Sequence, residues 1–421
     1  MHLRDLLNGN GSGRGFLQII SGTLAGQTVT LLALPFLTRL YSPEQYGEFA
    51  LLMSLSALGA PLLLLGMDQA VVKPSASSEV ASMVRAGVLG LLVTSVGFGV
   101  VVSSVPFFGR WPLLVSLRFF LPLSVFVLGI SMLLTQLHVR DRNYRSIGVR
   151  NSIQSVCTTG LQVTFGLGSI SQDLNGLVAG YILGTLIGCF VLLLGVDRRY
   201  LKATYRTVRQ TVVKEWQFPI VFAPSVVLAQ LAQQFPLLYF AATFGSEAAG
   251  HVGMAERLVA VPTALVGLAG ASVFTGDFST AVRRKDGSEL RIFRSFVTRL
   301  GLLGALSFLA FLCLVPPLIP TVLGEQWVGT ERIIQGMSII VLSRMLATPL
   351  RSTFRVIGGA KFLSGFEILR ACGLVLAGWA LTRGNADLMV SVVVIYSLIA
   401  FSDLVLVLGG YRQLIRFTGS N

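Results

Sequence analysis

The chain has 421 residues, of which 53% are hydrophobic and only 12% are charged. A soluble domain carries about 25% charged residues, so this composition excludes an ordinary water-soluble globular protein. The net charge of +14 does not indicate nucleic-acid binding, because the lysines and arginines lie in short segments between long apolar runs. Residues 86–109 and 216–246, for example, contain no charged side chain.

Apolar runs of membrane-spanning length follow one another through the chain. A helix of about 20 residues crosses the hydrocarbon core of a bilayer. This criterion predicts twelve spans, at 16–38, 47–72, 83–105, 117–138, 147–168, 174–196, 217–240, 250–275, 296–316, 333–356, 363–382 and 387–408. The fifth and tenth spans are the most polar, because the fifth contains Asn151, Gln154 and Gln162 and the tenth contains Arg344 and Arg351.

The basic residues are distributed unequally between alternate loops. If the amino terminus is cytoplasmic and residues at a span's edge are counted with the nearer loop, the loops on that side hold 25 of the 33 Lys and Arg residues, the opposite loops hold five, and three lie inside spans. Positive loops mark the cytoplasmic side of a membrane protein. The polar segment 1–15 shows no signal-peptide cleavage site, so the first span is expected to be retained. We therefore expect a multi-pass protein of the bacterial inner membrane with both termini in the cytoplasm.

The spans group into two halves. We expect an N-terminal six-helix bundle at 1–196, a basic cytoplasmic linker at 197–215 and a C-terminal six-helix bundle at 216–421. The arginines of the linker have helical spacing, which predicts an amphipathic helix on the anionic inner leaflet. A Glu-x-x-Gly pattern begins at Glu44 and again at Glu247, and the six-plus-six order predicts a parallel repeat about an axis along the membrane normal.

Three arginines, Arg257, Arg344 and Arg370, fall inside predicted spans. Each would cost about 2.5–3.5 kcal/mol at the centre of a lipid-facing helix, so we expect them to face protein or water. Arg344 and Arg351 share one face of the tenth span, and a cationic stripe of this kind suits an anionic ligand. The alternative is that Arg351 and Arg355 extend to the cytoplasmic surface.

Other polar side chains inside the spans are candidates for binding. Gln230, Gln233 and Gln234 form one face of the seventh span, where they would bind sugar hydroxyls in a wet cavity or contact other helices. Glu256 and Asp403 are candidate sites for a coupling ion. For Glu256 a structural ion pair is the alternative.

The sequence contains no recognisable catalytic or metal-binding signature. The three histidines form no HExxH motif, and the four cysteines show no CxxC spacing. No predicted loop is long enough to hold a soluble catalytic domain. Glu367 and Arg370 are three residues apart on a predicted helix, which predicts a local salt bridge. We expect neither an enzyme nor a bound cofactor or metal.

Two segments carry a family resemblance. Residues 34–56 (LPFLTRLYSPEQYGEFALLMSLS) resemble the first-loop signature of the polysaccharide-transporter family, the Wzx-type O-antigen and exopolysaccharide flippases. Residues 253–274 (GMAERLVAVPTALVGLAGASVF) resemble the eighth helix of that family. The length, the twelve spans and the basic central loop also match, so the resemblance covers nearly the whole chain.

The family belongs to the multidrug/oligosaccharidyl-lipid/polysaccharide exporter superfamily. The resemblance implies an all-α integral membrane fold with two six-helix bundles around a central cavity, and it places Arg257 and Arg344 in that cavity. It implies translocation of undecaprenyl-diphosphate-linked oligosaccharide for O-antigen, capsule or exopolysaccharide biosynthesis. The chain lacks the two additional helices of the lipid II flippase branch, which argues against a peptidoglycan precursor as cargo.

The expected function is therefore a flippase that works by alternating access. Its expected partners are the lipid-linked oligosaccharide and membrane lipids, with a coupling proton or sodium ion and the polysaccharide polymerase machinery as further candidates, and no nucleic acid. The alternatives are a multidrug or small-molecule exporter of the same superfamily and a non-transporting component of polysaccharide assembly. A membrane polymerase or ligase is disfavoured, because no large periplasmic loop is predicted.

Overall fold

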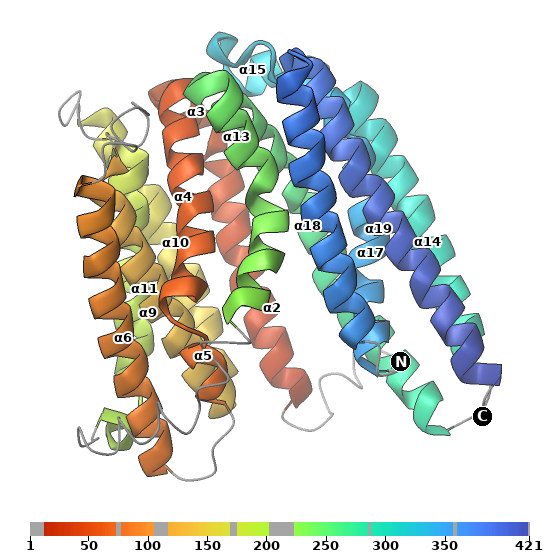
Figure 1. The fold of residues 1–421 in the computed structure, drawn as a ribbon, viewed down its shortest axis with the longest axis horizontal. Helices are drawn as coiled ribbons and strands as arrows, with labels where there is room; N and C mark the ends of the chain where they lie inside the picture. The colour runs from red at the N-terminus through yellow and green to blue at the C-terminus, as the bar shows by residue number, and fades with distance from the viewer. Residues whose placement is uncertain are drawn as a thin grey trace. The chain divides into compact units, whose positions relative to one another are not determined.

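The computed structural model describes residues 12–72, 77–104, 117–168, 175–201, 223–284, 288–356 and 360–419. All regular structure in these residues is helical (Figure 1). The chain divides into two compact units, Met1–Gln234 and Phe235–Asn421, which we call unit 1 and unit 2. Among the described residues, eight helices are long and apolar enough to cross a membrane.

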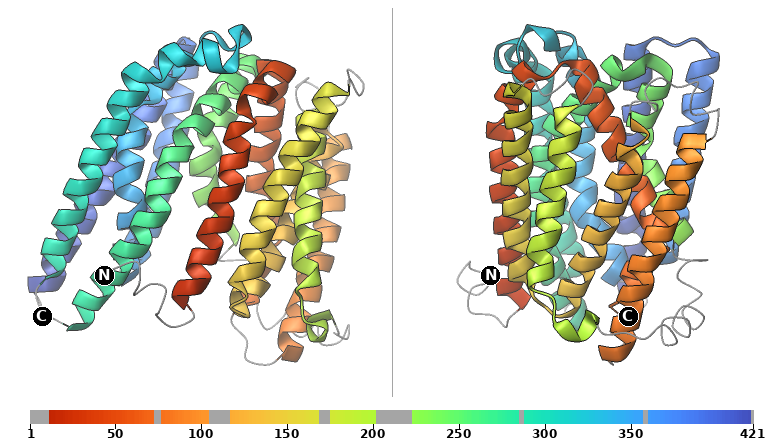
Figure 2. Two further views of the ribbon diagram at one scale, coloured as in Figure 1. Left: turned by 180° about the vertical axis from the view of Figure 1, so that it is seen from behind. Right: turned by 90° about the vertical axis from the view of Figure 1, so that its left-hand side faces the viewer.

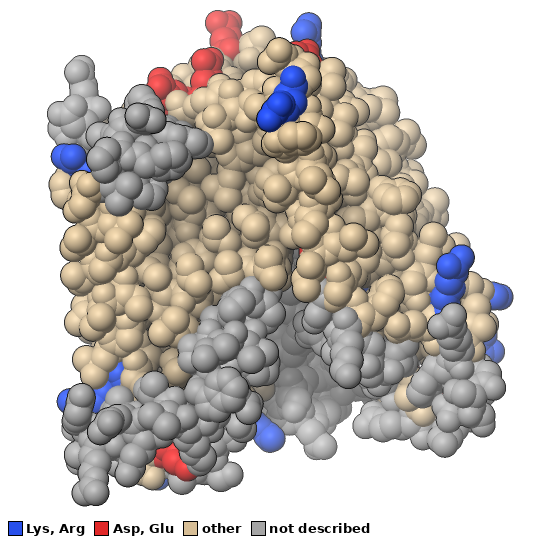
Figure 3. All heavy atoms as spheres, viewed as in Figure 1, with Lys and Arg blue, Asp and Glu red and all other residues tan. Residues whose placement is uncertain are grey.

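Charge is distributed along the helices as a bilayer requires. Among the described residues visible in Figure 3, the Lys, Arg, Asp and Glu side chains gather near the ends of the helices, and nearly all of the surface between the ends is uncharged. The hydrocarbon core of a membrane accepts such an apolar band, and the headgroup region and water accept the charged ends. The chain is therefore a multi-pass membrane protein.

Each of the six spans predicted for the first half coincides with a helix of unit 1. The helices are α2 (Ser12–Leu32), which α3 (Leu34–Leu40) continues, then α4 (Pro43–Leu63), α5 (Met67–Ala70), α6 (Ser77–Ser104), α9 (Phe120–Arg140), α10 (Tyr144–Leu167) and α11 (Gly176–Leu194). A short 3-10 turn follows at Arg198–Leu201. The rest of the predicted basic linker, from residue 202, lies outside the described residues, so its amphipathic helix stays a prediction.

The helix α10 has the most polar composition among the spans of unit 1. Its contacts with neighbouring helices explain why these polar side chains are tolerated in the membrane. It lies between α2 and α11 (Figure 2) and packs against both. Its three predicted polar side chains each donate a hydrogen bond to a neighbour: Asn151 to Thr23 Oγ1 at 3.0 Å, Gln154 to Thr185 Oγ1 at 3.2 Å, and Gln162 to the Leu177 carbonyl at 2.9 Å. The amide N–H donors are thus bonded to protein, which removes the cost of leaving them unpaired in lipid, whereas Gln154 Oε1 is buried without a hydrogen-bond partner.

Glycines on α11 allow α10 to approach closely. Four of them, which we call the glycine ladder, lie four residues apart and face α10: Gly176, Gly180, Gly184 and Gly188. A Cβ atom on Gly180 would lie 2.6 Å from Gln162 Cγ and 2.9 Å from its backbone nitrogen. Small residues of this kind are how membrane helices bring their backbones together.

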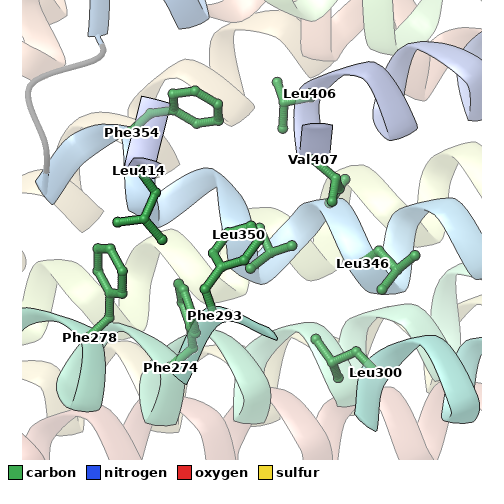
Figure 4. Packing of buried hydrophobic residues seen from close by; sticks show 11 residues of the cluster. Phe274, Phe278, Phe293, Leu300, Leu346, Leu350, Phe354, Leu406, Val407 and Leu414 are labelled. Carbon is green, nitrogen blue, oxygen red and sulfur yellow. The ribbon is translucent and has the colours of Figure 1, made fainter. Parts of the chain in front are cut away.

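The remaining six predicted spans coincide with helices that run from α13 to the carboxyl terminus. The helices are α13 (Ala223–Arg284), α14 (Glu289–Leu309), the π-helical turn η3 (Ala310–Leu314), α15 (Ile319–Leu323), α16 (Thr330–Met337), α17 (Ile339–Val356), α18 (Ala360–Arg383) and α19 (Leu388–Gly419). Contacts place residues 223–234 of α13 in unit 1. The core of unit 2 contains four phenylalanines, Phe274, Phe278, Phe293 and Phe354, with leucines of α17 and α19 (Figure 4).

The spans predicted at 217–240 and 250–275 are joined more tightly than expected. Instead of a loop at 241–249, the helix α13 contains one break at Gly245, where φ is 87° and ψ is −178°. Glycine adopts this backbone conformation without strain, whereas residues with a Cβ rarely do. The loop between the spans predicted at 250–275 and 296–316 is also shorter than expected, because α13 continues to Arg284 and α14 begins at Glu289.

The Glu-x-x-Gly pattern marks a corresponding turn in each unit. In unit 1, Ser42 separates α3 from α4, accepts a hydrogen bond from the Gln45 backbone and forms a capping box with it. In unit 2, Gly245 separates the two arms of α13. Glu44 and Glu247 each lie in the first turn of the helix that follows, where a negative charge is favoured. The two halves thus repeat this turn, and the axis that would relate them stays a prediction.

Candidate functional site

Six of the ionisable side chains described inside the helices of unit 2 form one group. We call it the charge network. It contains three arginines and three carboxylates from four helices: Glu256 of α13, Arg344 and Arg351 of α17, Glu367 and Arg370 of α18, and Asp403 of α19. With every group ionised, the network is formally neutral. A balanced set of buried charges is tolerated inside a membrane protein only when each charge faces an opposite charge or a hydrogen-bond partner.

Four members of the network form direct ion pairs. Arg351 Nη1 lies 2.6 Å from Glu367 Oε1, and its Nη2 lies 3.6 Å from Asp403 Oδ1. Arg370 Nη1 lies 3.4 Å from the same Asp403 oxygen and 4.0 Å from Glu367 Oε2. The other oxygen of Asp403 accepts a hydrogen bond of 3.4 Å from Ser343. Each arginine therefore contacts both carboxylates.

Burial differs within this set of ion pairs. The side chains of Arg370 and Asp403 are 5% and 3% exposed, whereas Glu367 is 13% and Arg351 is 31% exposed. These ion pairs therefore have a buried side and an accessible side, and Arg351 is the more accessible of their two arginines.

A second part of the network surrounds Glu256. Tyr396 of α19 donates a hydrogen bond of 2.7 Å to Glu256 Oε1, and the Tyr396 ring is fully buried. Arg344 interacts electrostatically with Glu256, with Tyr396 and with Arg370. Arg344 thus connects Glu256 to the ion pairs. The adjacent Arg257 is half-buried on α13.

The predicted site residues fall in two places. Arg344, Arg351, Glu256 and Asp403 belong to the charge network. Gln230, Gln233 and Gln234 lie on the part of α13 that belongs to unit 1, with Gln233 exposed and the other two half-buried. The side chain of Arg355 lies outside those described.

The predicted salt bridge between Glu367 and Arg370 is present at 4.0 Å, but Arg351 of the neighbouring helix is the closer partner of Glu367. Sequence spacing identifies partners on one helix, because residues three or four apart share a face. It does not identify Arg351 or Asp403 as partners, since they belong to other helices. Tyr396 was missed for the same reason.

Arg150 is a half-buried cation at the edge of the span predicted at 147–168. It lies in the second turn of α10, donates to Asn151 Oδ1 at 2.8 Å and also donates to Ser131 of α9. Its Nε is buried without a hydrogen-bond partner, and none of the ion pairs found among the described residues includes it. Arg150 lies two turns inside the helix from its N-cap, Asn143, and this position was the available signal that the side chain is not in a loop.

Comparison with known proteins identifies the family. A family model described as "Polysaccharide biosynthesis protein" matches residues 36–331. The chain belongs to this family. The matched range includes Arg150, Glu256 and Arg257 and ends before Arg344, so the family assignment and most of the charge network rest on different parts of the sequence. No curated protein sequence matches the chain at a significant level.

This member of the polysaccharide biosynthesis family is similar in structure to solved transporters. An inward-facing multidrug resistance MATE family transporter of the MOP superfamily has a TM-score of 0.70 at 12% identity, with 94% of this chain and 96% of that chain covered. The lipid II flippase MurJ, in an inward closed conformation, has a TM-score of 0.71 at 10% identity, with 94% and 86% covered.

A third solved structure is a MOP superfamily transporter from Pyrococcus furiosus, whose reversed binding-pocket polarity suggests a different function for that protein. It has a TM-score of 0.58 at 14% identity, with 99% of this chain and 98% of that chain covered. At these identities the likeness shows the fold. The family member described here therefore has the fold of the MOP superfamily transporters.

Proposed function

We propose that this protein is a flippase that moves undecaprenyl-diphosphate-linked oligosaccharide across the bacterial inner membrane by alternating access, for O-antigen, capsule or exopolysaccharide biosynthesis. The family assignment and the transporter fold support the class of function. The observation that carries the choice of cargo is the guanidinium of Arg351, which is 31% exposed at the accessible edge of a buried charge network.

The chemistry of the cargo explains the need for such an arginine. A diphosphate is anionic and an oligosaccharide is polar, so neither crosses the hydrocarbon core without a polar path. The guanidinium group presents paired N–H donors that match two phosphate oxygens. Arg351 and Arg344, two turns apart on α17, would hold the diphosphate, with Arg257 as a further cation. Gln230, Gln233 and Gln234 would bind sugar hydroxyls.

Coupling and topology complete the proposal. Glu256 and Asp403 would bind a coupling proton or sodium ion, since both are carboxylates inside the spans of unit 2. Both termini would lie in the cytoplasm, as the distribution of basic loops predicts. Polymerase machinery would receive the translocated cargo. The protein carries out transport and no covalent chemistry on its cargo.

The test is export in a bacterial strain that lacks the chromosomal copy and carries the protein on a plasmid. We expect Arg351→Gln and Arg344→Gln each to lower polysaccharide export at least tenfold and to cause lipid-linked oligosaccharide to accumulate on the inner leaflet. Arg412→Gln, which changes an exposed arginine of α19, is the matched control and should export normally. Wild-type export by both network variants would rule the proposal out. Drug efflux that depends on Glu256 would support the multidrug exporter instead.

A further inference from the structure

We propose that Glu367 binds a proton when an anionic group draws Arg351 away from the charge network. This inference rests on the proposed function, because it takes the diphosphate of the cargo as the anion. It assigns Glu367 a role distinct from those of Glu256 and Asp403, the two carboxylates proposed above for ion coupling. Two features decide which carboxylate takes the proton: the ion pairs that an incoming anion can reach, and the contacts that each carboxylate keeps after Arg351 has moved.

An anion can reach only one of the two directly paired arginines. Arg351 is 31% exposed, whereas Arg370 is 5% exposed and is held between Asp403 and Glu367. A diphosphate that approaches from the accessible side therefore binds Arg351 and leaves Arg370 in place. Because the guanidinium fork has a limited number of donors, phosphate oxygens and carboxylates compete for it.

Asp403 and Glu367 lose contacts of unequal strength when Arg351 turns away. Asp403 keeps Arg370 at 3.4 Å and the Ser343 hydroxyl at 3.4 Å, and it loses only a 3.6 Å contact. Glu367 loses its 2.6 Å partner, and among the described side chains its nearest remaining cation is Arg370 Nη1 at 4.0 Å. Glu367 is therefore the carboxylate that is left without a close positive charge.

After Arg351 has bound the anion, protonation of Glu367 is the least costly way to remove the uncompensated negative charge. Within the part of the chain whose side chains are described, the charged groups around Glu367 are Arg351 of α17, Asp403 of α19 and Arg370 of its own helix, and Arg344 of α17 interacts with Arg370. Once the anion engages Arg351, the two carboxylates share Arg370. An uncompensated charge in a desolvated site is strongly unfavourable. The guanidinium groups cannot release protons to correct the balance.

The proton balance of the step is simple. One proton from water bonds to a carboxylate oxygen of Glu367, which is 13% exposed and so remains accessible. Arg351 stays protonated and exchanges one anionic partner for another. No other bond forms or breaks. When the anion leaves, Arg351 returns to Glu367 and the proton is released.

The direction of the coupling between anion and proton determines how a proton gradient affects transport. Anion and proton bind together, so an inward proton gradient acting through Glu367 would oppose export of the anion. Glu367 therefore lowers the charge that the loaded site carries through the membrane, and it does not supply the driving force. Coupling to an ion gradient remains with the other two carboxylates, Glu256 and Asp403.

The experiment measures proton uptake on binding to the full-length protein in nanodiscs of phosphatidylcholine. Inorganic pyrophosphate and farnesyl diphosphate are the probes, and they distinguish a free anion from a lipid-linked one. Isothermal titration calorimetry in two buffers of different ionisation enthalpy gives the number of protons taken up per bound probe. We expect the wild-type protein to take up about one proton more than Glu367→Gln does, and its affinity to fall by up to about tenfold more per unit rise in pH.

Controls separate this inference from the proposed function. Glu325→Gln changes an exposed carboxylate outside the charge network and should take up protons as the wild-type protein does. Equal proton uptake by Glu367→Gln and wild type would overturn the inference while leaving cargo binding at Arg351 intact. Binding that is unchanged in Arg351→Gln, or no binding of either probe, would overturn the cargo site and the inference with it.

A second measurement does not depend on the stability of a variant. Infrared difference spectra of the wild-type protein, recorded before and after addition of pyrophosphate, should show a new protonated carboxylic acid band. The band should shift in deuterated water. If the carboxylate bands do not change on binding, the inference is wrong.

Discussion

The arginines inside the helices have different partners in the two units. Arg351 and Arg370 of unit 2 each contact two carboxylates. Arg150 of unit 1 bonds to Ser131 and Asn151, both of which are neutral. A buried cation with neutral partners retains most of its desolvation penalty, whereas a paired cation offsets part of it.

This difference predicts that the same substitution changes the free energy of unfolding by unequal amounts at the two sites. Arg370→Gln should lower the free energy of unfolding by about 3–5 kcal/mol, because it leaves Asp403 and Glu367 to share Arg351 alone in a desolvated site. Arg150→Gln should lower it by less than about 1 kcal/mol or raise it, because it removes a poorly compensated charge. Denaturation of the detergent-solubilised protein measures both, with the exposed Arg145→Gln on α10 as the control. A larger loss for Arg150→Gln than for Arg370→Gln would contradict this reading of the two sites.

Tyr41 gives unit 1 a predicted dependence on alkaline pH. Its hydroxyl donates a 2.7 Å hydrogen bond to the Gln162 carbonyl, and burial raises the pKa of Tyr41 from 10.0 to about 12. Between these values the unfolded chain loses this proton and the folded protein keeps it. Stability therefore falls as pH rises from 10 to 12.

Thermal unfolding at pH 8 and at pH 11 tests this dependence. Tyr41→Phe should be less stable than wild type at pH 8 by about 1 kcal/mol, because it loses the hydrogen bond. It should also lose less stability than wild type between the two pH values. An identical alkaline loss in both proteins would show that Tyr41 does not contribute.

At the scale of elements, the pair α10 and α11 shows how a polar helix is accommodated. The glycine ladder brings the α11 backbone against α10, and the amides of α10 bond to its two neighbours. Neither feature stabilises the pair without the other, since the hydrogen bonds require close approach. Substitution of a glycine in the ladder therefore tests whether the close approach of α10 and α11 is required.

Two glycines in this helix pair offer a matched test. A Cβ at Gly180 would meet Gln162, including its backbone nitrogen, whereas a Cβ at Gly160 of α10 would meet nothing within 4 Å. Gly180→Ala should therefore destabilise the protein by about 1–3 kcal/mol through overpacking. Gly160→Ala should stabilise it by about 0.5–1 kcal/mol, because alanine favours the helix. Equal effects in thermal unfolding would mean that the close approach is not required.

The sequence predicted the elements better than it predicted the contacts between them. Apolar runs located a helix for every predicted span, since the length of a span depends on bilayer thickness. The turn at Gly245 was not predicted, because a single residue with positive φ leaves no gap in hydropathy. The shared face of Arg344 and Arg351 followed from helical spacing. The contacts of Arg351 with Glu367 and Asp403 depend on how three helices pack, which hydropathy does not report.

At the scale of the whole molecule, the order of the helices predicts a topology. Seven predicted spans separate Arg142, in the turn between α9 and α10, from Asn385, between α18 and α19. An odd number of crossings places the two turns on opposite sides of the membrane. The distribution of basic residues assigns the Arg142 side to the cytoplasm.

Cysteine labelling tests this topology. In a background without the four native cysteines, Asn385→Cys should react with a membrane-impermeant maleimide in intact cells. Arg142→Cys should react only after the cells are permeabilised. Both positions are exposed turn residues, so accessibility to the reagent is matched. Labelling of both from the same side would show that the number of crossings is wrong.

The dependence of α10 on α11 also bears on how the protein is made. A nascent helix with unpaired amides and an arginine such as Arg150 partitions poorly from the translocon into lipid. Only eight residues separate Leu167, the last of α10, from Gly176, the first of α11, so the second helix emerges shortly after the first. We expect the two to leave the translocon together as a preassembled hairpin, and a ribosome stalled between them to leave α10 outside the bilayer.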